Sequence, residues 1–529
     1  MKILMMTNTY APIVGGLEKS IQSFSDEFRA KGHEVKIVAP EFPNMPPHEK
    51  DVIRVPALEK FVGTNFSVSL PLPELISNLV EEYKPDIVHS HHPFLIGGLA
   101  LRLCGQKNIP LVFTYHTMFE YYKDHFGMDH ETIQKFVVDL AAGYANMVDQ
   151  VIVPSESVRA LLKERNITTP MEVVPTGIDV KKFAPVASSY RKKNRIPKNA
   201  FMVGHVGRLA PEKNLNFLME AVAEFLRQEK KAIFLVVGSG PSERDMKKVL
   251  RRWNVEKRVR FAGILKGRRL IEAYHAMDAF VFASKSETQG MVVAEAMAAG
   301  LPVVALDAAG VREVVVDRHN GRLLNEESRK KFASALLWCS SRNQKQWADM
   351  RDNALKTAHT FSLEACAIKA LMVYKKTVRR HHPYGQEDIS KWEALVGRFK
   401  TEVDILSNLG RAAASAIVQS VVSEASTKER VFQYYEKQIQ RVRKSWMLHI
   451  KKVRKQKKEM SVEEKQKLEV LLEEAMKKMR MFEMELAELN RKVFTACEFF
   501  EKHLGEAGAL FDKGLTLSQE QSGEEKAKE

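Results

Sequence analysis

The stretch from 278 to 305 constrains the fold of this chain more than any other. It opens with a short apolar run of strand type, 278–283, and continues through a polar loop that ends at Gly290. Good helix formers fill 291–299, a glycine stops that segment, and the apolar run 301–305 reads as another strand. A strand–loop–helix–strand unit belongs to a parallel sheet, in which ligands bind at the carboxyl ends of strands and against helix N-termini.

Two acidic residues, Glu287 and Glu295, stand eight positions apart in this unit. Glu287 falls in the loop, and Glu295 falls about one turn inside the helix. An arbitrary pair of acids would be solvated, but Glu295 is surrounded by apolar residues, where a buried acid needs a partner. We therefore expect the two carboxylates to hold two hydroxyl-rich parts of one ligand, whose phosphates would lie on the helix N-terminus between them.

Length and composition predict several domains with large cores, since the chain has 529 residues, of which 45% are apolar. Four cysteines lie far apart without metal or redox spacing, which favours a reducing compartment. The N-terminal apolar run is too short for a signal peptide, and no segment approaches the roughly 20 apolar residues that cross a bilayer. We expect a soluble or peripheral protein whose net charge of +16 favours a phosphate, a membrane surface or nucleic acid as partner.

Strands alternate with helices from residue 1 to about 180, which predicts a doubly wound first domain. This domain opens with a strand, 1–7, a loop containing Gly15 and Gly16, and a helix, 17–31. Gly16 would let backbone N–H groups approach a phosphate, although a simple tight turn explains two glycines equally well.

Histidines gather at the ends of two strand-type runs. His89, His91 and His92 end one run, and His116 ends the next. They lack the helical i,i+4 spacing and the accompanying acids of common metal sites. We expect pocket-lining or structural histidines, and we predict no metal site.

A second α/β domain begins near residue 201 with a strand, a glycine-bearing turn and a helix. Arg208 and Lys213 flank the start of that helix, and two cations beside a helix N-terminus can clamp a diphosphate. Taken alone, the same two residues would more simply be solvated. The strand-to-glycine pattern recurs at 233–240 and at 260–263.

Four motifs of this chain resemble those of the retaining glycosyltransferases of family 4. They are Gly-Arg-Leu-x3-Lys at 207–213, Val-Val-Gly-Ser-Gly-Pro at 236–241, Val-Arg-Phe-Ala-Gly at 259–263 and Glu-Thr-Gln-Gly-Met-Val-Val-Ala-Glu-Ala-Met at 287–297. The resemblance covers about 1–380. It implies an α/β fold of the GT-B type, in which two doubly wound Rossmann-like domains face each other across a cleft.

The resemblance also implies a nucleoside-diphosphate sugar as donor substrate, bound mainly by the second domain without a cofactor. Arg208 and Lys213 would hold the pyrophosphate, and Glu295 would take the ribose hydroxyls. Glu287 would hold the transferred sugar together with backbone at the helix start. The backbone groups are those of Gly290, Met291 and Val292.

From the first domain, the resemblance implies roles for two residues. Gly16 would approach the phosphate, and His116 would contact the sugar near the reacting carbon. Family members attack from the same face of the sugar, and the leaving phosphate takes the proton of the acceptor. The chain has no D-x-D motif, and the negative charge on the leaving phosphate would be stabilised by cations and helix N–H groups without a metal.

Three segments resemble the branch that glucosylates or mannosylates lipids: 91–97, 114–125 and Thr288-Gln289, where many family members have phenylalanine in place of Gln289. Enzymes of that branch act on diacylglycerol or phosphoinositide acceptors at a membrane surface. The resemblance therefore implies a lipid acceptor and a cytoplasmic, peripheral location at the inner face of the membrane. Glycosyl transfer to a soluble sugar or to a cell-envelope polysaccharide remains the alternative.

Three further stretches favour contact with an anionic membrane. Residues 117–136 interleave aromatic and apolar groups with cations, 244–269 carries eleven Lys and Arg, and 441–458 carries nine. The competing interpretation is that the first stretch lines a cleft for a soluble acceptor and that the cations are solvated. Residues 385–529 hold 27 basic against 25 acidic residues, so most of the excess charge lies before them.

The predicted organisation has four parts. An acceptor domain, 1–185, is rejoined by a returning helix at 362–382, and a nucleotide-sugar domain spans 186–361. An all-α, coiled-coil-like extension, 388–510, forms a helical hairpin or bundle, and 516–529 is a disordered tail.

The extension is predicted from two S-x-x-E capping boxes and from a heptad seam that starts after Ser461. Such a seam offers a route to self-association through the C-terminal helices.

Two other function classes compete with a transferase. A nucleic-acid binder would explain the pI of about 9.4, but no recognised nucleic-acid motif is present, and we predict no nucleic-acid partner. An inactive, transferase-like scaffold would recruit partners through its coiled coil. The intact set of four charged residues argues against a scaffold: Arg208, Lys213, Glu287 and Glu295.

Overall fold

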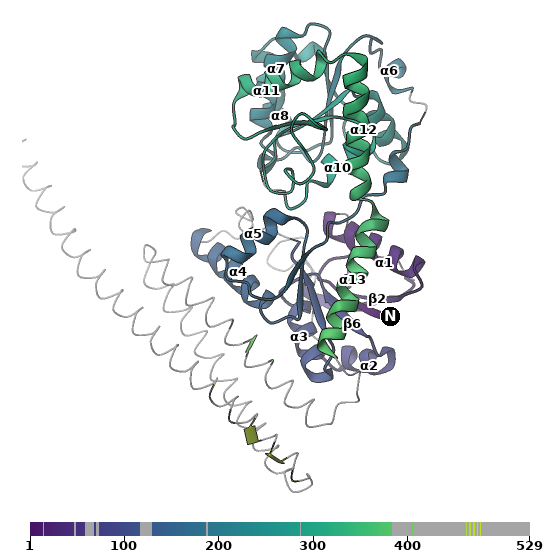
Figure 1. Cartoon of the computed structure of the whole chain (residues 1–529), viewed down its shortest axis with the longest axis vertical. Coiled ribbons are helices and arrows are strands. Elements are labelled where there is room, and N and C mark those ends of the chain that lie inside the picture. Colours follow the sequence, from purple (N-terminus) through teal and green to yellow (C-terminus); the bar gives the residue numbers. More distant parts are fainter. Residues whose placement is uncertain are drawn as a thin grey trace, which may run out of the picture. The chain divides into compact units, whose positions relative to one another are not determined.

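The computed structural model describes most of the chain up to residue 382 (Figure 1). The described residues are 1–13, 15–46, 49–58, 68–69, 73–116, 130–186, 189–285 and 287–382, together with single helical positions between 401 and 477. By compactness the chain divides into two units. The first unit comprises 1–104, 109–121 and 145–387, and the second comprises 105–108, 122–144 and 388–529.

The first sheet has seven strands in the order β3-β2-β1-β6-β7-β8-β9, and every pairing is parallel. Its strands are β1 (Lys2–Met6), β2 (Glu34–Pro40), β3 (Val52–Val55), β6 (Ile87–Ser90), β7 (Leu111–Thr114), β8 (Gln150–Val153) and β9 (Met171–Val173). A separate antiparallel pair joins β4 (Ala57–Leu58) to β5 (Val68–Ser69). The helices of this part of the chain are α1 (Gly16–Ala30), α2 (Pro73–Tyr83), α3 (Ile96–Lys107), α4 (His130–Ala145) and α5 (Glu156–Glu164).

The second sheet has six parallel strands in the order β12-β11-β10-β13-β14-β15. Its strands are β10 (Met202–Val206), β11 (Ile233–Val237), β12 (Val259–Phe261), β13 (Ala279–Phe282), β14 (Val303–Leu306) and β15 (Gly321–Leu324). The helices are α6 (Tyr190–Lys193), α7 (Leu215–Gln228), α8 (Glu243–Arg252), α9 (Arg268–Ala276), α10 (Met291–Ala298), α11 (Arg329–Ser340) and α12 (Gln344–Thr360).

Both faces of the second sheet are covered, which explains why its four inner strands, β10, β11, β13 and β14, are buried at every position rather than in alternation. In β14, Val303 and Ala305 belong to one buried cluster, whereas Val304 and Leu306 belong to another. The fold class that we predicted from the alternation of strands and helices, two doubly wound parallel sheets, is confirmed.

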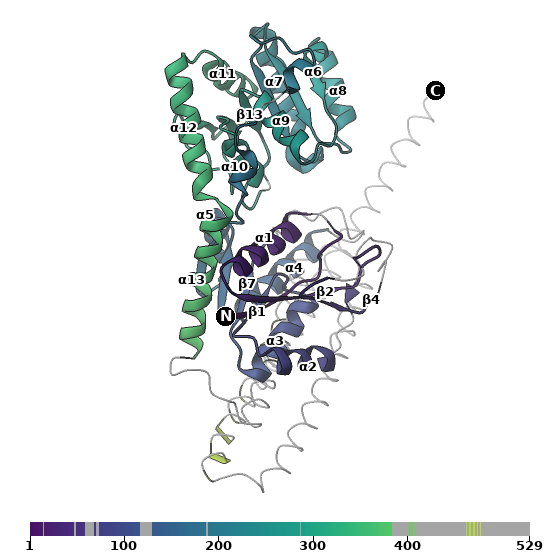
Figure 2. The ribbon, with the colours of Figure 1, turned by 90° about the vertical axis from the view of Figure 1, so that its right-hand side faces the viewer.

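The last long helix, α13 (Leu363–His381), packs beside α1 and against the first sheet (Figure 2). The rings of Phe28 and Tyr374 lie 5.5 Å apart at this contact. At the start of α13, the Leu363 N–H donates to the Ile178 carbonyl over 3.0 Å. A Cβ on Gly177 would lie 2.4 Å from the Leu363 Cα, so the two segments cross too closely for a side chain there.

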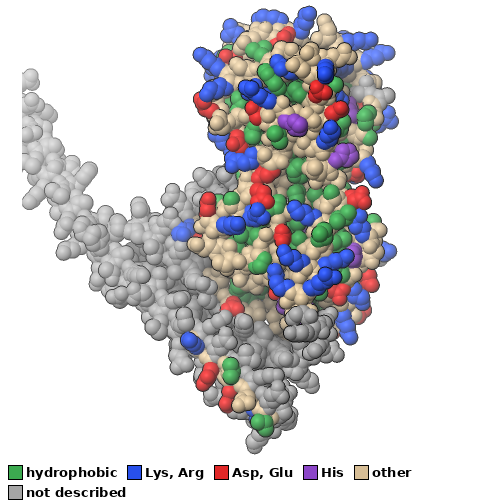
Figure 3. Space-filling model, viewed as in Figure 1, with side chains coloured by type: hydrophobic (Ala, Val, Ile, Leu, Met, Phe, Trp, Pro, Cys, Tyr) green, Lys and Arg blue, Asp and Glu red, His purple; other side chains and the backbone are tan. Residues whose placement is uncertain are grey.

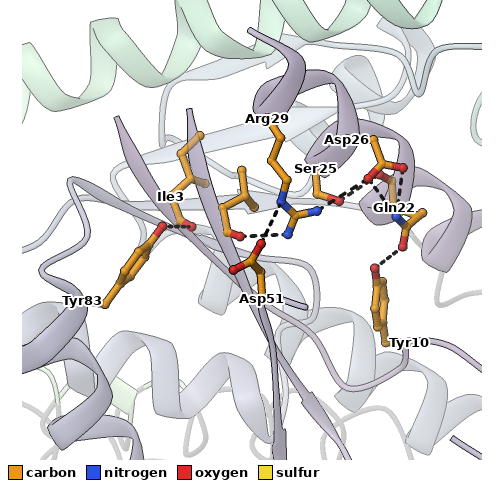
Figure 4. Close-up of polar contacts among 9 residues, drawn as sticks. Ile3, Tyr10, Gln22, Ser25, Asp26, Arg29, Asp51 and Tyr83 are labelled. Carbon is orange, nitrogen blue, oxygen red and sulfur yellow. Dashed lines mark hydrogen bonds and ion pairs between the residues drawn. The ribbon is translucent and has the colours of Figure 1, made fainter. Parts of the chain in front are cut away.

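Polar contacts fix α1 on the first sheet (Figure 4). Arg29 donates to the Val35 carbonyl over 2.8 Å and forms an ion pair with Asp51 over 3.7 Å. The Gln22 amide donates to Asp26 over 2.9 Å, and the Tyr10 hydroxyl donates to Gln22. These contacts hold the helix whose first turn carries Gly16.

Little of the predicted C-terminal extension is described. The described positions between 401 and 477 are all helical, and the Asn408 amide donates to the Leu140 carbonyl over 3.0 Å. The heptad seam, the basic stretch 441–458 and the tail 516–529 lie outside the described residues. Among the residues that the structure describes, no helix is both long and apolar enough to cross a membrane.

Candidate active site

The loop after β10 carries the two predicted cations. Gly207 follows the strand and donates its N–H to the Val237 carbonyl, which ties this loop to the end of β11. The guanidinium of Arg208 is exposed and forms an ion pair with Glu212 one turn later. Lys213 ends a short 3-10 turn, and Asn214, in the left-handed conformation, starts α7. The two cations therefore lie at one strand end, as their spacing predicted, but only Lys213 is largely buried.

The loop after β13 brings Glu287 onto Lys213. The Lys213 Nζ lies 2.6 Å from a Glu287 carboxylate oxygen, and the two side chains are 23% and 17% exposed. Gly290, with a φ of 66°, is the N-cap of α10, a conformation that favours glycine. Gly310 approaches this loop so closely that a Cβ there would lie 2.5 Å from the Gln289 nitrogen.

Glu295 lies one turn inside α10 with two partners that the sequence did not reveal. Its Oε1 accepts from the Lys19 ammonium of α1 over 3.0 Å, and its Oε2 lies 3.4 Å from the Tyr274 hydroxyl of α9. Burial, together with the nearby Glu295 carboxylate, raises the pKa of Tyr274 well above its usual value, so this hydroxyl keeps its proton. Glu295 is 15% exposed, and these contacts satisfy the requirement of a nearly buried acid for a partner.

Gly16, the first residue of α1, has open space around it. A Cβ there would meet no atom within 4 Å among the described residues. Packing among the described residues therefore does not require glycine at this position. The open space beside the first turn of α1 is compatible with the predicted approach of a phosphate to Gly16.

Three of the four predicted histidines, His89, His91 and His116, line a pocket with about 340 Å³ of empty space, part of it open to solvent. His92 instead accepts from the Asn8 N–H over 3.1 Å. Its polar lining is formed by Ser20, His89, His91, Thr114, His116, Thr176 and Tyr374. The His91 Nδ1 and the His116 Nε2 lie 3.0 Å apart, so one of these rings donates its proton to the other. The described residues contain no cluster of three or more side chains that could hold a metal ion.

Burial keeps the histidines of this pocket neutral. It lowers the pKa of His89 and that of His116 to about 3, and it lowers the pKa of His91 well below its usual value. At neutral pH, His116 can therefore donate or accept a hydrogen bond, but it carries no charge to stabilise a leaving phosphate.

Comparison with known proteins identifies the chain. Residues 14–182 match the family described as Glycosyltransferase Family 4, and residues 187–357 match Glycosyl transferases group 1. The chain is 30% identical to the GDP-mannose-dependent alpha-mannosyltransferase of Mycolicibacterium smegmatis over 338 residues. This alignment covers 61% of the chain and 84% of the relative. This chain belongs to glycosyltransferase family 4.

Other relatives of this glycosyltransferase include the alpha-monoglucosyldiacylglycerol synthase of Streptococcus pneumoniae. The two are 29% identical over 386 residues, which is 69% of this chain and 86% of the relative. A solved structure of sucrose-phosphate synthase from Thermosynechococcus elongatus superposes with a TM-score of 0.58 at 23% identity, over 71% of this chain and 98% of that one. Anabaena Alr3699/HepE in complex with UDP gives a TM-score of 0.57 at 22% identity, over 71% and 100%. These likenesses show that the glycosyltransferase has the GT-B fold.

Gln289, which distinguishes this glycosyltransferase from many family members, has a structural use that the sequence did not predict. Its side chain accepts from the Thr176 N–H over 2.7 Å and donates to the Thr176 carbonyl over 2.5 Å. The Thr176 hydroxyl lies 3.0 Å from that of Ser20 in α1. The amide of Gln289 is thus engaged by backbone, and it holds the loop before Gly290 against the segment that follows β9.

Proposed function

We propose that this glycosyltransferase moves a hexose from a nucleoside-diphosphate sugar to a hydroxyl group of a membrane glycerolipid, with retention at the anomeric carbon. The observation that carries the proposal is the Lys213–Glu287 pair at the N-terminal end of α10, with Glu295 one turn further along that helix. This arrangement places a cation, a helix N-terminus and two separate carboxylates within reach of one ligand. Such a ligand has phosphates at its centre and hydroxyl-rich sugars at both ends.

Each part of the donor has a matching group in this proposal. The diphosphate lies on Lys213, Arg208 and the first N–H groups of α10, and the ribose hydroxyls donate to Glu295. The transferred sugar donates to Glu287 and reaches the backbone of Gly290, Met291 and Val292. Gly16 and His116 approach the donor from the part of the chain that forms the first sheet.

The chemistry follows from the charges of these groups. The bond between the anomeric carbon and the phosphate oxygen breaks, and the acceptor oxygen forms a new bond to that carbon on the same face. The acceptor proton passes to the departing phosphate oxygen. Fixed cations and helix N–H groups stabilise the negative charge that develops on the phosphate, and they require no metal ion for this step.

Replacing Arg208 or Lys213 with alanine should weaken the binding of UDP or GDP tenfold to a hundredfold, because a charge-assisted hydrogen bond contributes about 1.5–3 kcal/mol. Titration calorimetry with both nucleotides measures the loss. Lys331→Ala is the control, since Lys331 is a cation that is paired with an acid, Glu326, and is exposed as Arg208 is. An effect of Lys331→Ala as large as that of Lys213→Ala would contradict the assignment.

The same assignment predicts that transfer continues in excess chelator. The comparison needs only one donor and one acceptor, assayed with and without chelator. Complete loss of activity in chelator, restored by a divalent ion, would overturn the metal-independent chemistry.

The lipid acceptor is proposed from the relatives and from the surface charge. The name of the Streptococcus pneumoniae relative specifies a diacylglycerol product. In this chain, Lys and Arg side chains spread over the part that contains α7, α8 and α11 (Figure 3). Six exposed cations between 244 and 269 have no ion-pair partner among the described residues: Arg244, Arg251, Lys257, Arg260, Lys266 and Arg269. Ile264 lies among them and is 65% exposed, and an apolar side chain among cations suits an anionic membrane surface.

Vesicle binding tests this acceptor. Co-sedimentation should rise with the fraction of anionic lipid and fall with added salt. Replacing Arg244, Arg251 and Lys257 together with glutamine should reduce binding about tenfold to a hundredfold, since each basic group near an anionic surface contributes about 1 kcal/mol. The matched control replaces Lys192, Lys193 and Lys198, which are equally exposed.

Equal partitioning onto neutral and anionic vesicles, with efficient transfer only to soluble sugars, would overturn the lipid acceptor and leave the glycosyltransferase assignment intact. Of the stretch that we also predict to contact lipid, residues 117–129, including Tyr121 and Tyr122, lie outside the described residues, whereas 130–136 belong to α4. Replacing both tyrosines with aspartate should reduce vesicle binding and transfer to lipid together. The peripheral, inner-face location and the domain boundaries given above are part of the same proposal.

A further inference from the structure

Lys19 lies in the first turn of α1, three residues after Gly16. Its N–H donates to the Gly15 carbonyl over 3.1 Å, and its ammonium lies 3.0 Å from the Oε1 of Glu295, 276 positions later in the chain. The lysine side chain is 61% exposed, whereas that of Glu295 is 15% exposed. The carboxylate is therefore held in place, and the ammonium is free to move into solvent or onto another anion.

The proposed donor needs the carboxylate that Lys19 occupies. If the ribose hydroxyls donate to Glu295, the Oε1 exchanges an ammonium donor for a hydroxyl donor. The Tyr274 hydroxyl lies 3.4 Å from the other carboxylate oxygen, Oε2. At this distance its hydrogen bond is weak, so it competes little with a ribose hydroxyl for Oε2. The displaced ammonium is then available to pair with another anion close by.

The nearest such anion would be the diphosphate of the same ligand. One helical turn, about 5.4 Å, separates Glu295 from the start of α10, where the diphosphate is proposed to bind. A lysine side chain has four rotatable methylene bonds and spans this distance by changing rotamers. The other two proposed cations are also paired with acids in this structure, Arg208 with Glu212 and Lys213 with Glu287.

We propose that Lys19 is a donor-binding residue that exchanges its ion pair with Glu295 for the diphosphate of the bound donor. The inference rests on the proposed donor site. In that site α1 contributes only the backbone of Gly16, and the inference adds a charged side chain from the same helix. Lys19 thus joins the leaving diphosphate to α1, whereas Glu295 is released to bind ribose.

Binding of UDP, GDP and the two nucleosides without phosphate tests the proposal in the full-length protein. Of UDP and GDP, one is expected to bind the wild type more tightly. Lys19→Met should lower the affinity for that diphosphate about tenfold, as expected for the loss of one charge-assisted contact of a partly exposed side chain. It should not weaken binding of the corresponding nucleoside, and it should strengthen that binding to the extent that Lys19 competes with ribose for Glu295. Lys19→Arg should retain most of the diphosphate affinity. The matched control is Lys31→Met, which removes the same charge beside the end of α1 and also breaks an ion pair, with Glu364 over 3.5 Å.

Two results would overturn the inference while leaving the donor site in place. One is an equal, small effect of Lys19→Met and Lys31→Met on diphosphate binding. The other is an equal change for nucleoside and diphosphate, which would mean that Lys19 acts only by holding Glu295. A wild-type protein that binds neither UDP nor GDP would instead overturn the proposed function, and the inference with it.

Discussion

Replacing Glu287 with alanine is expected to lower turnover at saturating donor by about a hundredfold or more while the protein remains folded. Hydrogen bonds to sugar hydroxyls strengthen as the sugar becomes oxocarbenium-like, so their loss acts on the transition state more than on donor binding. Removing one preorganised group at a reacting centre commonly costs about 10²–10³ in turnover. Glu287 belongs to a loop rather than to a core cluster, and its ion-pair partner, Lys213, is 23% exposed and so retains access to water.

The comparison needs two other variants. Glu287→Gln keeps the shape and one acceptor oxygen, and we expect it to be intermediate. Glu327→Ala is the control, because Glu327 pairs with Lys285 of the same loop and accepts from Asn214, which follows Lys213. Thermal unfolding of all three variants checks the fold. If Glu287→Ala retains near-normal turnover, or if Glu327→Ala is equally impaired, Glu287 does not contact the transferred sugar.

Sequence patterns were sufficient for the architecture because the relevant signals are local. Four strands of the second sheet, β10, β11, β13 and β14, are short runs that are buried at every position. A glycine directly follows two of them, Gly207 after β10 and Gly238 after β11. The resemblance to family 4 assigned Lys213 and Glu287 to one donor site, and in the structure the Lys213 Nζ lies 2.6 Å from a Glu287 carboxylate oxygen.

The partners that tune this site could not be read in the same way. Lys19 and Tyr274 meet Glu295, and Gln289 meets the backbone of Thr176, only because tertiary packing brings distant segments together. The sequence around a lysine in the first turn of a helix, or around a tyrosine within a helix, does not predict such a tertiary contact. The one available sign was indirect: the apolar surroundings of Glu295 required a partner without naming it.

The free energy of unfolding should fall steeply as the pH drops from 7 to 5. Burial lowers the pKa of His89 and His116 to about 3, that of His92 and His205 to about 4, and that of His91 further, so these rings stay neutral in the folded protein. In the unfolded chain they bind protons near their ordinary pKa of about 6.5. A group whose folded pKa is lowered in this way leaves stability unaffected above about pH 6.5 and reduces it progressively below that value.

The expected loss is large because five groups act in the same direction. Each histidine that stays neutral in the folded protein lowers the free energy of unfolding by up to about 1.4 kcal/mol per pH unit below 6.5. For the five groups together, the expected loss by pH 5 is up to about 10 kcal/mol. Whole domains are commonly stable by only about 5–15 kcal/mol, and this loss therefore approaches the stability of the fold. Carboxyls whose pKa is lowered by a basic partner, such as Asp317 beside Arg322 and Glu327 beside Lys285, contribute their losses only at lower pH.

Chemical denaturation at pH 5 to 8 measures this dependence, and His205→Phe isolates one contribution. His205 is buried on β10 between Phe280 and Phe282, with ring centroids 6.3 and 6.2 Å from theirs, so an aromatic ring suits the position. Below about pH 6.5, the free energy of unfolding of the variant should fall less steeply with decreasing pH than that of the wild type. The slopes should differ by the equivalent of about one proton, because the variant lacks one ring that is protonated in the unfolded chain. A free energy of unfolding that is equal at pH 7.5 and pH 5.5 would show that the buried histidines accept protons in the native state. In that case His116 could carry a positive charge beside the donor at moderately acidic pH, and the neutral role given to it above would be wrong.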